Sequence, residues 1–239
     1  MALDLTSVQY LRGTAALAFV IISIIIGLRI ISKYFSYRQK ELITVGLSWI
    51  LLSSPWWGGA FAFLFYLFGI QFTPELYLFI GNFFIPFALI TWIYSFSRLA
   101  YPEIKNKIFY PYLVISLGFL AFIIYALFVD YTLIGELEDE LNSRHSVFSL
   151  ILVIFALISL LITGTLFARK SLKSNDPQIK WKGRFLLAAF LIFIFGALLD
   201  AIVPAIPFLL VTIKLILVIS GILYYLGFFL SEKLGKKLA

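Results

Sequence analysis

The most constraining feature of this chain is a series of seven long apolar stretches separated by short polar connections. The stretches cover residues 14–32, 42–66, 76–97, 108–129, 146–168, 185–203 and 206–231. A helix needs about 20 apolar residues to cross the roughly 30 Å of hydrocarbon in a bilayer. Because the stretches use most of the 239 residues, the sequence predicts an all-α polytopic membrane protein, with a single seven-transmembrane helix bundle over 1–239.

Positive charge alternates between the connections of these stretches. Apart from Arg12, Arg144 and Lys214, every lysine and arginine lies in or beside the connections after the first, third and fifth stretches, or after the last one. Short loops rich in lysine and arginine stay on the cytoplasmic side of a membrane. We therefore expect a multi-pass protein of the cell membrane, with its N-terminus outside, its C-terminus inside and the lipid bilayer as its solvent.

The composition argues against several classes of protein. Hydrophobic residues make up 62% of the chain, charged residues 13%, and the net charge is +7. The basic residues flank apolar segments, so we expect them to meet lipid headgroups, and we expect no nucleic-acid partner. The chain has no cysteine, one histidine and one methionine, which leaves few ligands for a metal or haem. The sequence also lacks paired carboxylates within the apolar stretches and nucleophile–base motifs, so we expect no enzyme.

Local composition predicts three irregular features. The segment Ser53-Ser54-Pro55-Trp56-Trp57-Gly58-Gly59 interrupts the second stretch, and its proline removes a backbone hydrogen bond, so we expect a kink there. The acidic connection 130–145 is expected to form a short helix on the outer surface. The prolines of Pro204-Ala205-Ile206-Pro207 predict a tight turn, which makes the last two stretches an antiparallel hairpin.

Two ionisable residues stand inside apolar stretches, Asp200 in the sixth and Lys214 in the seventh. Each would cost several kcal/mol if it faced lipid alone, so each is expected to have a partner. Counted from the turn, their depths differ by roughly 6 Å, and a lysine side chain leans toward the N-terminus of its helix, so an ion pair is geometrically reasonable. The pair either fixes the register of the hairpin or opens into an outer-facing cavity that meets a charged ligand or ion.

Three further residues are candidates for the same pocket. Asn82 in the third stretch either hydrogen-bonds to another helix or makes a polar contact in a pocket. Trp56 and Trp57 either belong to the interfacial aromatic belt or line an amphiphile pocket at the kink. The candidate ligand-binding residues are Lys214, Asp200, Asn82, Trp56 and Trp57.

Lys214 also suggests a specific cofactor. A seven-helix bundle with an outer N-terminus and a lysine in the middle of its last helix resembles the rhodopsins, in which such a lysine carries retinal. Against microbial rhodopsins, this chain has Leu210 where they place an aspartate, and Asn82 where they carry an arginine followed by an acid. The run Phe190-Leu191-Ile192-Phe193 replaces the tryptophan and proline that line retinal. We expect no cofactor, and retinal on Lys214 remains an alternative.

The connection after the fifth stretch carries a second resemblance. It reads Phe167-Ala168-Arg169-Lys170-Ser171-Leu172-Lys173-Ser174-Asn175-Asp176-Pro177-Gln178 and continues through Lys180-Trp181-Lys182-Gly183-Arg184 to Gly196-Ala197-Leu198-Leu199-Asp200. This pattern resembles the last inner loop and sixth helix of prokaryotic seven-transmembrane sensor regions, which precede membrane histidine kinases. The resemblance implies a stand-alone sensor that relays a signal to a separate cytoplasmic signalling partner. The residues expected to dock this partner are Arg169, Lys170, Lys173, Lys180, Lys182 and Arg184.

Three function classes remain open at this point. A receptor or sensor for a small apolar or amphiphilic ligand predicts a polar-lined outer cavity that reaches Lys214, Asp200, Asn82 and Trp56. An accessory or structural subunit of a membrane complex predicts a tight pair of Lys214 and Asp200 without a cavity. A retinal-binding protein or small transporter predicts a central pocket at Lys214. We favour the first, because isolated ionisable groups within spans are usually functional.

Overall fold

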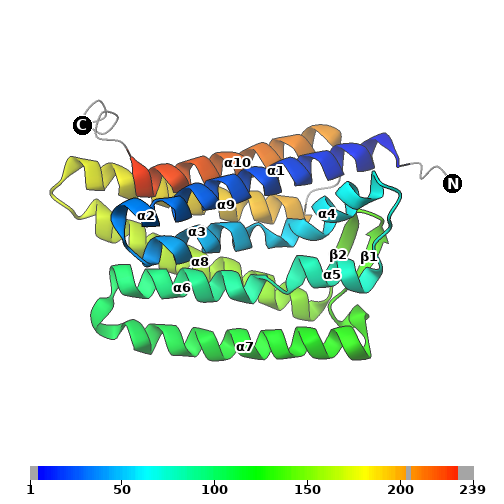
Figure 1. Cartoon of the computed structure of the whole chain (residues 1–239), viewed down its shortest axis with the longest axis horizontal. Coiled ribbons are helices and arrows are strands. Elements are labelled where there is room, and N and C mark those ends of the chain that lie inside the picture. Colours follow the sequence, from blue (N-terminus) through cyan, green and yellow to red (C-terminus); the bar gives the residue numbers. More distant parts are fainter. Residues whose placement is uncertain (1–4, 203–205, 231–239) are drawn as a thin grey trace.

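Long apolar helices lying side by side form almost the whole molecule, and one small β-hairpin lies at one end of the bundle (Figure 1). The computed structural model describes residues 5–202 and 206–230. The helices of the first half are α1 (Ser7–Ser32), α2 (Tyr34–Tyr37), α3 (Glu41–Leu52), η1 (Ser54–Trp56), α4 (Trp57–Tyr66), α5 (Pro74–Asn82) and α6 (Ile85–Ala100). The rest are η2 (Pro102–Ile104), α7 (Lys105–Val129), η3 (Tyr131–Leu133), β1 (Gly135–Asp139), β2 (Asn142–His145), α8 (Val147–Leu172), α9 (Pro177–Ile202) and α10 (Pro207–Phe229).

Six helical segments are long and apolar enough to cross a membrane. They are Ser7–Tyr37, Pro74–Ala100, Pro102–Val129, Val147–Leu172, Pro177–Ala201 and Pro207–Phe229. Large apolar side chains lie on the outer surface of the bundle, and Phe128, Val147 and Phe208 are 88%, 76% and 76% exposed. A surface of this kind suits lipid better than water. These features indicate an all-α, multi-pass membrane protein.

The remaining apolar stretch, expected over 42–66, is divided into α3, η1 and α4, each too short to cross a membrane alone. The three pieces follow one another along the bundle in Figure 1. The break is the expected kink, because Pro55 stands at the start of η1 and cannot donate a backbone hydrogen bond. A second break separates α5 from α6 just before Pro86.

Several helices extend beyond the apolar stretches that predicted them. The first begins at Ser7, seven residues before the expected start at 14, because Thr6 and Gln9 form a capping box at its N-terminus. The sixth begins at Pro177 instead of 185. Hydropathy detects only the apolar part of a helix, whereas capping residues and proline at the first turn decide where the helix begins.

The acidic connection differs from its prediction. It does not form a surface helix; residues 135–145 form the antiparallel hairpin β1–β2, in which Gly135 pairs with His145 and Leu137 with Ser143. Its buried anchors Ile134 and Leu141 are 0% and 3% exposed. Long-range packing of these anchors decides the structure of this segment, which its local charge pattern does not reveal.

Two names for the ends of the bundle are used below. The hairpin end carries β1–β2 and the starts of α1, α5, α8 and α10, and the basic end carries the connection between α8 and α9. The hairpin half and the basic half are the halves of the bundle next to these ends. The expected turn at 204–207 falls largely on residues 203–205, and Lys233, Lys236 and Lys237 of the tail follow residue 230, so both lie outside the described residues.

Candidate functional site

A cavity of about 670 Å³ occupies the hairpin half of the bundle. Its walls come from α1, α3, η1, α4, α5, α6, α8, α9 and α10, and residues of β1–β2 lie over it. Pockets of roughly 300–1,000 Å³ with a few polar groups among apolar walls are typical of small-molecule sites. Four of the five candidate residues line this cavity, namely Lys214, Asp200, Asn82 and Trp56.

Lys214 and Asp200 form an ion pair in the wall of the cavity. The Lys214 Nζ lies 2.5 Å from Asp200 Oδ1, and the two side chains are 9% and 21% exposed. Trp56 Nε1 donates a hydrogen bond of 2.6 Å to Asp200 Oδ2. The ammonium also lies 5.3 Å from the centre of the Trp56 ring, close enough for a cation–π interaction. Each carboxylate oxygen therefore has a donor, and the buried charges balance.

Close packing of α9 against α10 sets the register of this pair. A Cβ atom at Gly196 would lie 2.9 Å from Leu217 Cδ2, and one at Gly227 would lie 2.4 Å from Leu186 Cγ. These two contacts fix the helices at two levels along their length. Lys214 then reaches toward the N-terminus of α10, the direction in which long helical side chains point. The ion pair that the spacing made reasonable is present.

Asn82 is the last residue of α5 and is 3% exposed. Its Nδ2 donates a hydrogen bond of 3.0 Å to the Leu78 carbonyl of its own helix, and among residues 5–202 and 206–230 no hydrogen bond joins Asn82 to another helix, which was one of its two expected roles. Within the described part of the chain, Asn82 Oδ1 has no hydrogen-bond partner. A buried acceptor without a donor costs about 1–3 kcal/mol, so this oxygen is a suitable point for a ligand.

The two tryptophans of the kink have different surroundings. Trp56 lines the cavity and packs edge-on against Phe19, with ring centres 5.0 Å apart. Trp57 instead donates from Nε1 to Ser53 Oγ at 2.9 Å and packs against Phe84. Trp57 is not among the cavity-lining residues that the structure brings together, although the sequence offered both tryptophans.

The β-hairpin is fastened over the cavity by bonds to three helices. Arg12 of α1 forms an ion pair of 2.7 Å with Asp139, and Tyr77 of α5 donates to the Leu141 carbonyl at 3.0 Å. Ser149 of α8 donates to the carbonyl of Ile134, which precedes β1, at 2.6 Å. These bonds tie the acidic connection to the bundle through Asp139 and two backbone carbonyls, whereas Glu136, Glu138 and Glu140 are exposed.

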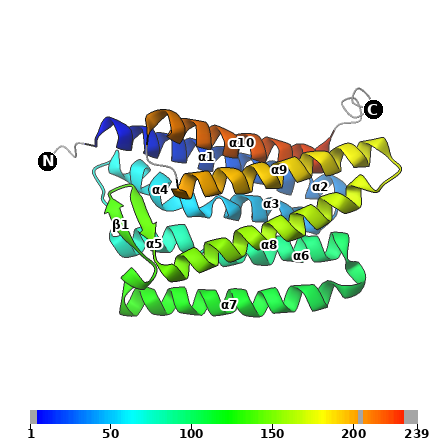
Figure 2. The same cartoon turned by 180° about the vertical axis from the view of Figure 1, so that it is seen from behind.

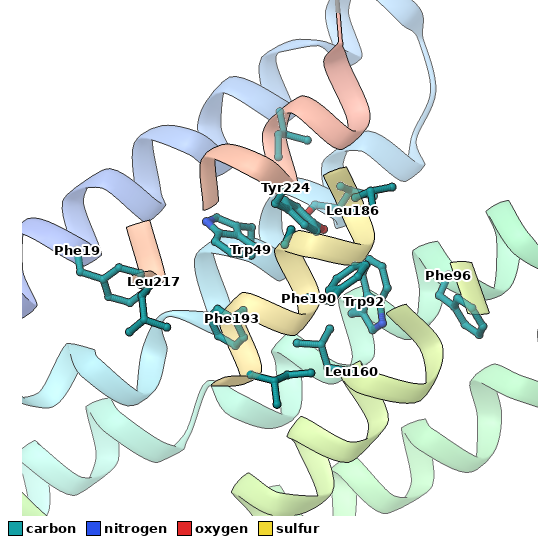
Figure 3. Packing of buried hydrophobic residues seen from close by; sticks show 14 of the residues in the cluster. Phe19, Trp49, Trp92, Phe96, Leu160, Leu186, Phe190, Phe193, Leu217 and Tyr224 are labelled. Carbon is teal, nitrogen blue, oxygen red and sulfur yellow. The ribbon is translucent and has the colours of Figure 1, made fainter. Parts of the chain in front are cut away.

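A layer of buried aromatic side chains packs beside the cavity-lining residue Phe193 (Figure 3). Phe193 lines the cavity and packs against Trp49, with ring centres 5.5 Å apart. Trp49 stacks on Tyr224 at 4.6 Å, and Tyr224 is fully buried. Phe190 and Trp92 continue this layer, with ring centres 5.0 Å apart. The layer is therefore in contact with the cavity wall.

The six basic residues expected to dock a partner lie around the connection between α8 and α9. Lys170 is engaged within the protein, because its ammonium donates to the Ala100 carbonyl and lies over the Tyr101 ring. Lys182 is half-buried. Lys170 is nevertheless exposed, as are Arg169, Lys173, Lys180 and Arg184.

Sequence reasoning missed Arg12, Tyr77 and Phe193 as residues around the cavity. Arg12 carried the clearest available signal, since it is a charged residue in the second turn of an apolar helix. Tyr77 and Phe193 are ordinary members of aromatic-rich stretches, and only their positions in the bundle distinguish them. A comparison of the sequence with protein-family models finds no match, and a comparison with curated proteins finds none either.

Proposed function

We propose that this protein is a membrane receptor or sensor that binds a small apolar or amphiphilic molecule in the cavity of its hairpin half. The observation that carries the proposal is the cavity itself, with Lys214, Asp200, Trp56 and Asn82 in its walls. Ionisable groups inside membrane spans usually mark a functional site, and here they are placed in a space large enough for a ligand.

The proposal includes a topology of seven spans. In it, α3, η1 and α4 cross the membrane together as one broken span, in addition to the six long segments. Irregular backbone within a membrane is tolerated where it is covered by protein or lines a cavity, and Pro55 of η1 lines the cavity. The distribution of lysine and arginine favours an orientation with the hairpin end outside the cell and the basic end in the cytoplasm.

A signal would travel along α9. This helix runs over 26 residues, or about 39 Å, with Lys180 in its first turn and Asp200 in its last. A ligand that changes the position of Asp200 would therefore move the same rigid element that carries part of the basic set. The exposed residues Arg169, Lys173, Lys180 and Arg184 are the surface for a cytoplasmic partner.

The two alternative functions, accessory subunit and retinal protein, explain the ion pair of Lys214 and Asp200 in different ways. An accessory subunit accounts for the 2.5 Å contact of Lys214 with Asp200, but it gives no reason for a cavity beside that contact. A retinal protein accounts for both, with Asp200 as the counterion of a Schiff base on Lys214. The same experiment tests this reading.

The test is a lipid-extract mass analysis and an absorbance spectrum of the purified protein, with and without added all-trans retinal. We expect a co-purifying molecule that is lost in Lys214→Met and reduced in Asp200→Asn. The matched control is Lys107→Met, which removes an exposed lysine near the basic end and should retain the molecule. A visible band lost in Lys214→Met would establish retinal instead, and unchanged content in both cavity variants would contradict a ligand site at this pair.

A further inference from the structure

The walls of the cavity offer one hydrogen-bond acceptor and one donor that the protein leaves partly unused. Asn82 Oδ1 is buried and has no partner within residues 5–202 and 206–230. The Lys214 ammonium has three N–H groups, and Asp200 accepts one of them. A hydroxyl group is the smallest neutral group that can donate to the first and accept from the second.

Both groups belong to the wall of one cavity. The turn that carries Trp56 lies beside α5, since a Cβ at Gly81 would lie 3.7 Å from the Pro55 carbonyl oxygen. Trp56 donates to Asp200, the partner of Lys214. Asn82 and Lys214 are therefore connected through neighbouring residues of the same wall.

Charge balance in the walls selects the kind of head group. Lys214 is paired with Asp200, and Arg12 is paired with Asp139. A ligand with a net charge would bring an uncompensated charge into a place of low dielectric constant, where isolated charges are strongly disfavoured. Arg144 and Glu138 also line the cavity, but both side chains are exposed and water can screen their opposite charges. The site therefore favours an uncharged head.

An apolar wall extends from this polar end between α8 and α9. In the basic half the two helices touch closely, since a Cβ at Gly164 would lie 2.6 Å from the Phe190 ring and one at Gly183 would lie 3.0 Å from the Ala168 carbonyl. In the hairpin half the same two helices diverge (Figure 2). Both line the cavity there, through Leu150, Val153, Leu157, Ala197 and Ala201.

This wall also reaches the surface of the protein that faces lipid. Leu150 lines the cavity and is 45% exposed, and Ala201 is exposed as well. A hydrocarbon chain lying between α8 and α9 would contact the cavity at one end and the bilayer at the other.

We propose that the cavity takes a single-chain lipid with an uncharged hydroxyl head, of the long-chain alcohol class, from the leaflet at the hairpin end. Its hydroxyl donates to Asn82 Oδ1 and accepts from Lys214 Nζ, and its chain leaves the protein between α8 and α9. This inference rests on the proposed function, since it specifies the ligand of the same cavity.

The test compares three probes with the same tail and different heads, namely tetradecanol, tetradecanoate and tetradecyltrimethylammonium. Each competes with radiolabelled tetradecanol for the protein in nanodiscs. We expect the alcohol to bind at least about tenfold more tightly than either charged probe, which corresponds to about 1.4 kcal/mol. Tighter binding of a charged probe, or equal binding of all three, would overturn the proposal of a neutral head.

Substitutions in the cavity wall should change the order of affinity of the three probes. Asn82→Leu removes the acceptor and should weaken tetradecanol binding about tenfold. Asp200→Asn leaves the positive charge of Lys214 without a counter-charge, so this variant should prefer tetradecanoate. Lys214→Met leaves the negative charge of Asp200 without a counter-charge, so this variant should prefer the cationic probe. The double variant of Asp200→Asn with Lys214→Met restores neutrality and should again prefer the alcohol over both ions, while Lys107→Met should leave all three affinities unchanged.

Ala197→Phe tests the path of the chain, because a larger side chain at this cavity residue narrows the space between α8 and α9. It should slow association of tetradecanol about tenfold, and an unchanged rate would overturn this path. Failure of the inference remains distinct from failure of the proposed function. If no probe binds but another co-purifying molecule is lost in Lys214→Met, the ligand class is wrong and the receptor stands. If no probe binds and no molecule co-purifies, both are contradicted.

Discussion

The two halves of this bundle differ in what fills the space between their helices. Close contacts at glycines occur in both, since a Cβ at Gly46 in the basic half would lie 2.5 Å from the Gly27 carbonyl oxygen and one at Gly13 in the hairpin half would lie 2.3 Å from the Phe63 ring. In the basic half, buried aromatic rings such as Trp92 and Phe190 fill the remaining space. In the hairpin half, two helices are broken beside Pro55 and Pro86, and the bundle opens around a cavity.

This difference indicates that the two halves of the bundle have different roles. Without a hydrophobic driving force between helices in lipid, close contact of small residues and dispersion between rings hold the basic half together. That rigid half allows the hairpin half to keep polar groups, breaks and empty space. The ion pair of Lys214 and Asp200 lies in the open half, next to the aromatic layer at Phe193.

The largest expected effect comes from filling a contact in the basic half. In Gly46→Leu the new side chain would meet the Gly27 carbonyl and Ile31, so α1 and α3 must separate. We expect a loss of at least about 3 kcal/mol in the free energy of unfolding, measured by denaturant titration in detergent. The control is Gly81→Ala in the cavity wall, where the nearest atom is 3.7 Å away and stability should not fall. Equal losses in both variants would break the comparison of the two halves.

Breaking the buried ion pair should have the next largest effect. Asp200→Asn leaves the 9% exposed Lys214 without its counter-charge, and we expect the free energy of unfolding to fall by about 3 kcal/mol. Adding Lys214→Met should recover most of that loss, because two neutral groups replace the pair. Additive losses in the double variant, in the same titration, would show that the two residues do not act as a pair.

A smaller effect is expected at the hairpin. Arg12→Leu removes the ion pair with Asp139, whose side chains are 16% and 30% exposed, and should cost about 1 kcal/mol. Amide hydrogen exchange should become faster across 135–145, with no change in the first turns of α9. Faster amide exchange both across 135–145 and in the first turns of α9 would mean that the hairpin stabilises the whole bundle and not only the cover of the cavity.

The smallest effect should come from Lys170→Met in the basic half. It removes from an exposed side chain the hydrogen bond to the Ala100 carbonyl and the contact with the Tyr101 ring, for a loss of about 0.5 kcal/mol. Amide hydrogen exchange of residues 100–104 measures this loss. The neighbouring exposed Lys173 provides the control, since Lys173→Met should leave exchange there unchanged.

The kink and the paired residues of the site could be predicted because each depends on a few neighbouring residues. Pro55 must interrupt a helix wherever it lies, and two buried charges on adjacent helices must find each other. The acidic connection was mispredicted as a helix because its structure depends on Arg12 and Tyr77, which are distant in sequence. Asn82 was placed correctly in the third apolar stretch, yet its bond to its own helix could not be read from sequence.

Trp56 and Trp57 show the limit of local reasoning most clearly. They are adjacent and have the same chemistry, but in the tight 3₁₀ turn successive side chains point about 120° apart. One therefore contacts Asp200 and the other contacts Ser53 and Phe84. A pattern that names both residues cannot choose between them.

The sequence by itself determined that this is a multi-pass helical membrane protein, that the second apolar stretch breaks near Pro55, and which two charges lie among apolar residues. These properties depend on hydropathy and proline positions summed along the chain. Only the tertiary structure decided that a cavity of about 670 Å³ exists and that Lys214, Asp200, Asn82 and Trp56 share it. The physical reason is that a cavity depends on the tilt and rotation of helices, which contacts such as Gly164 with Phe190 set between residues far apart in sequence.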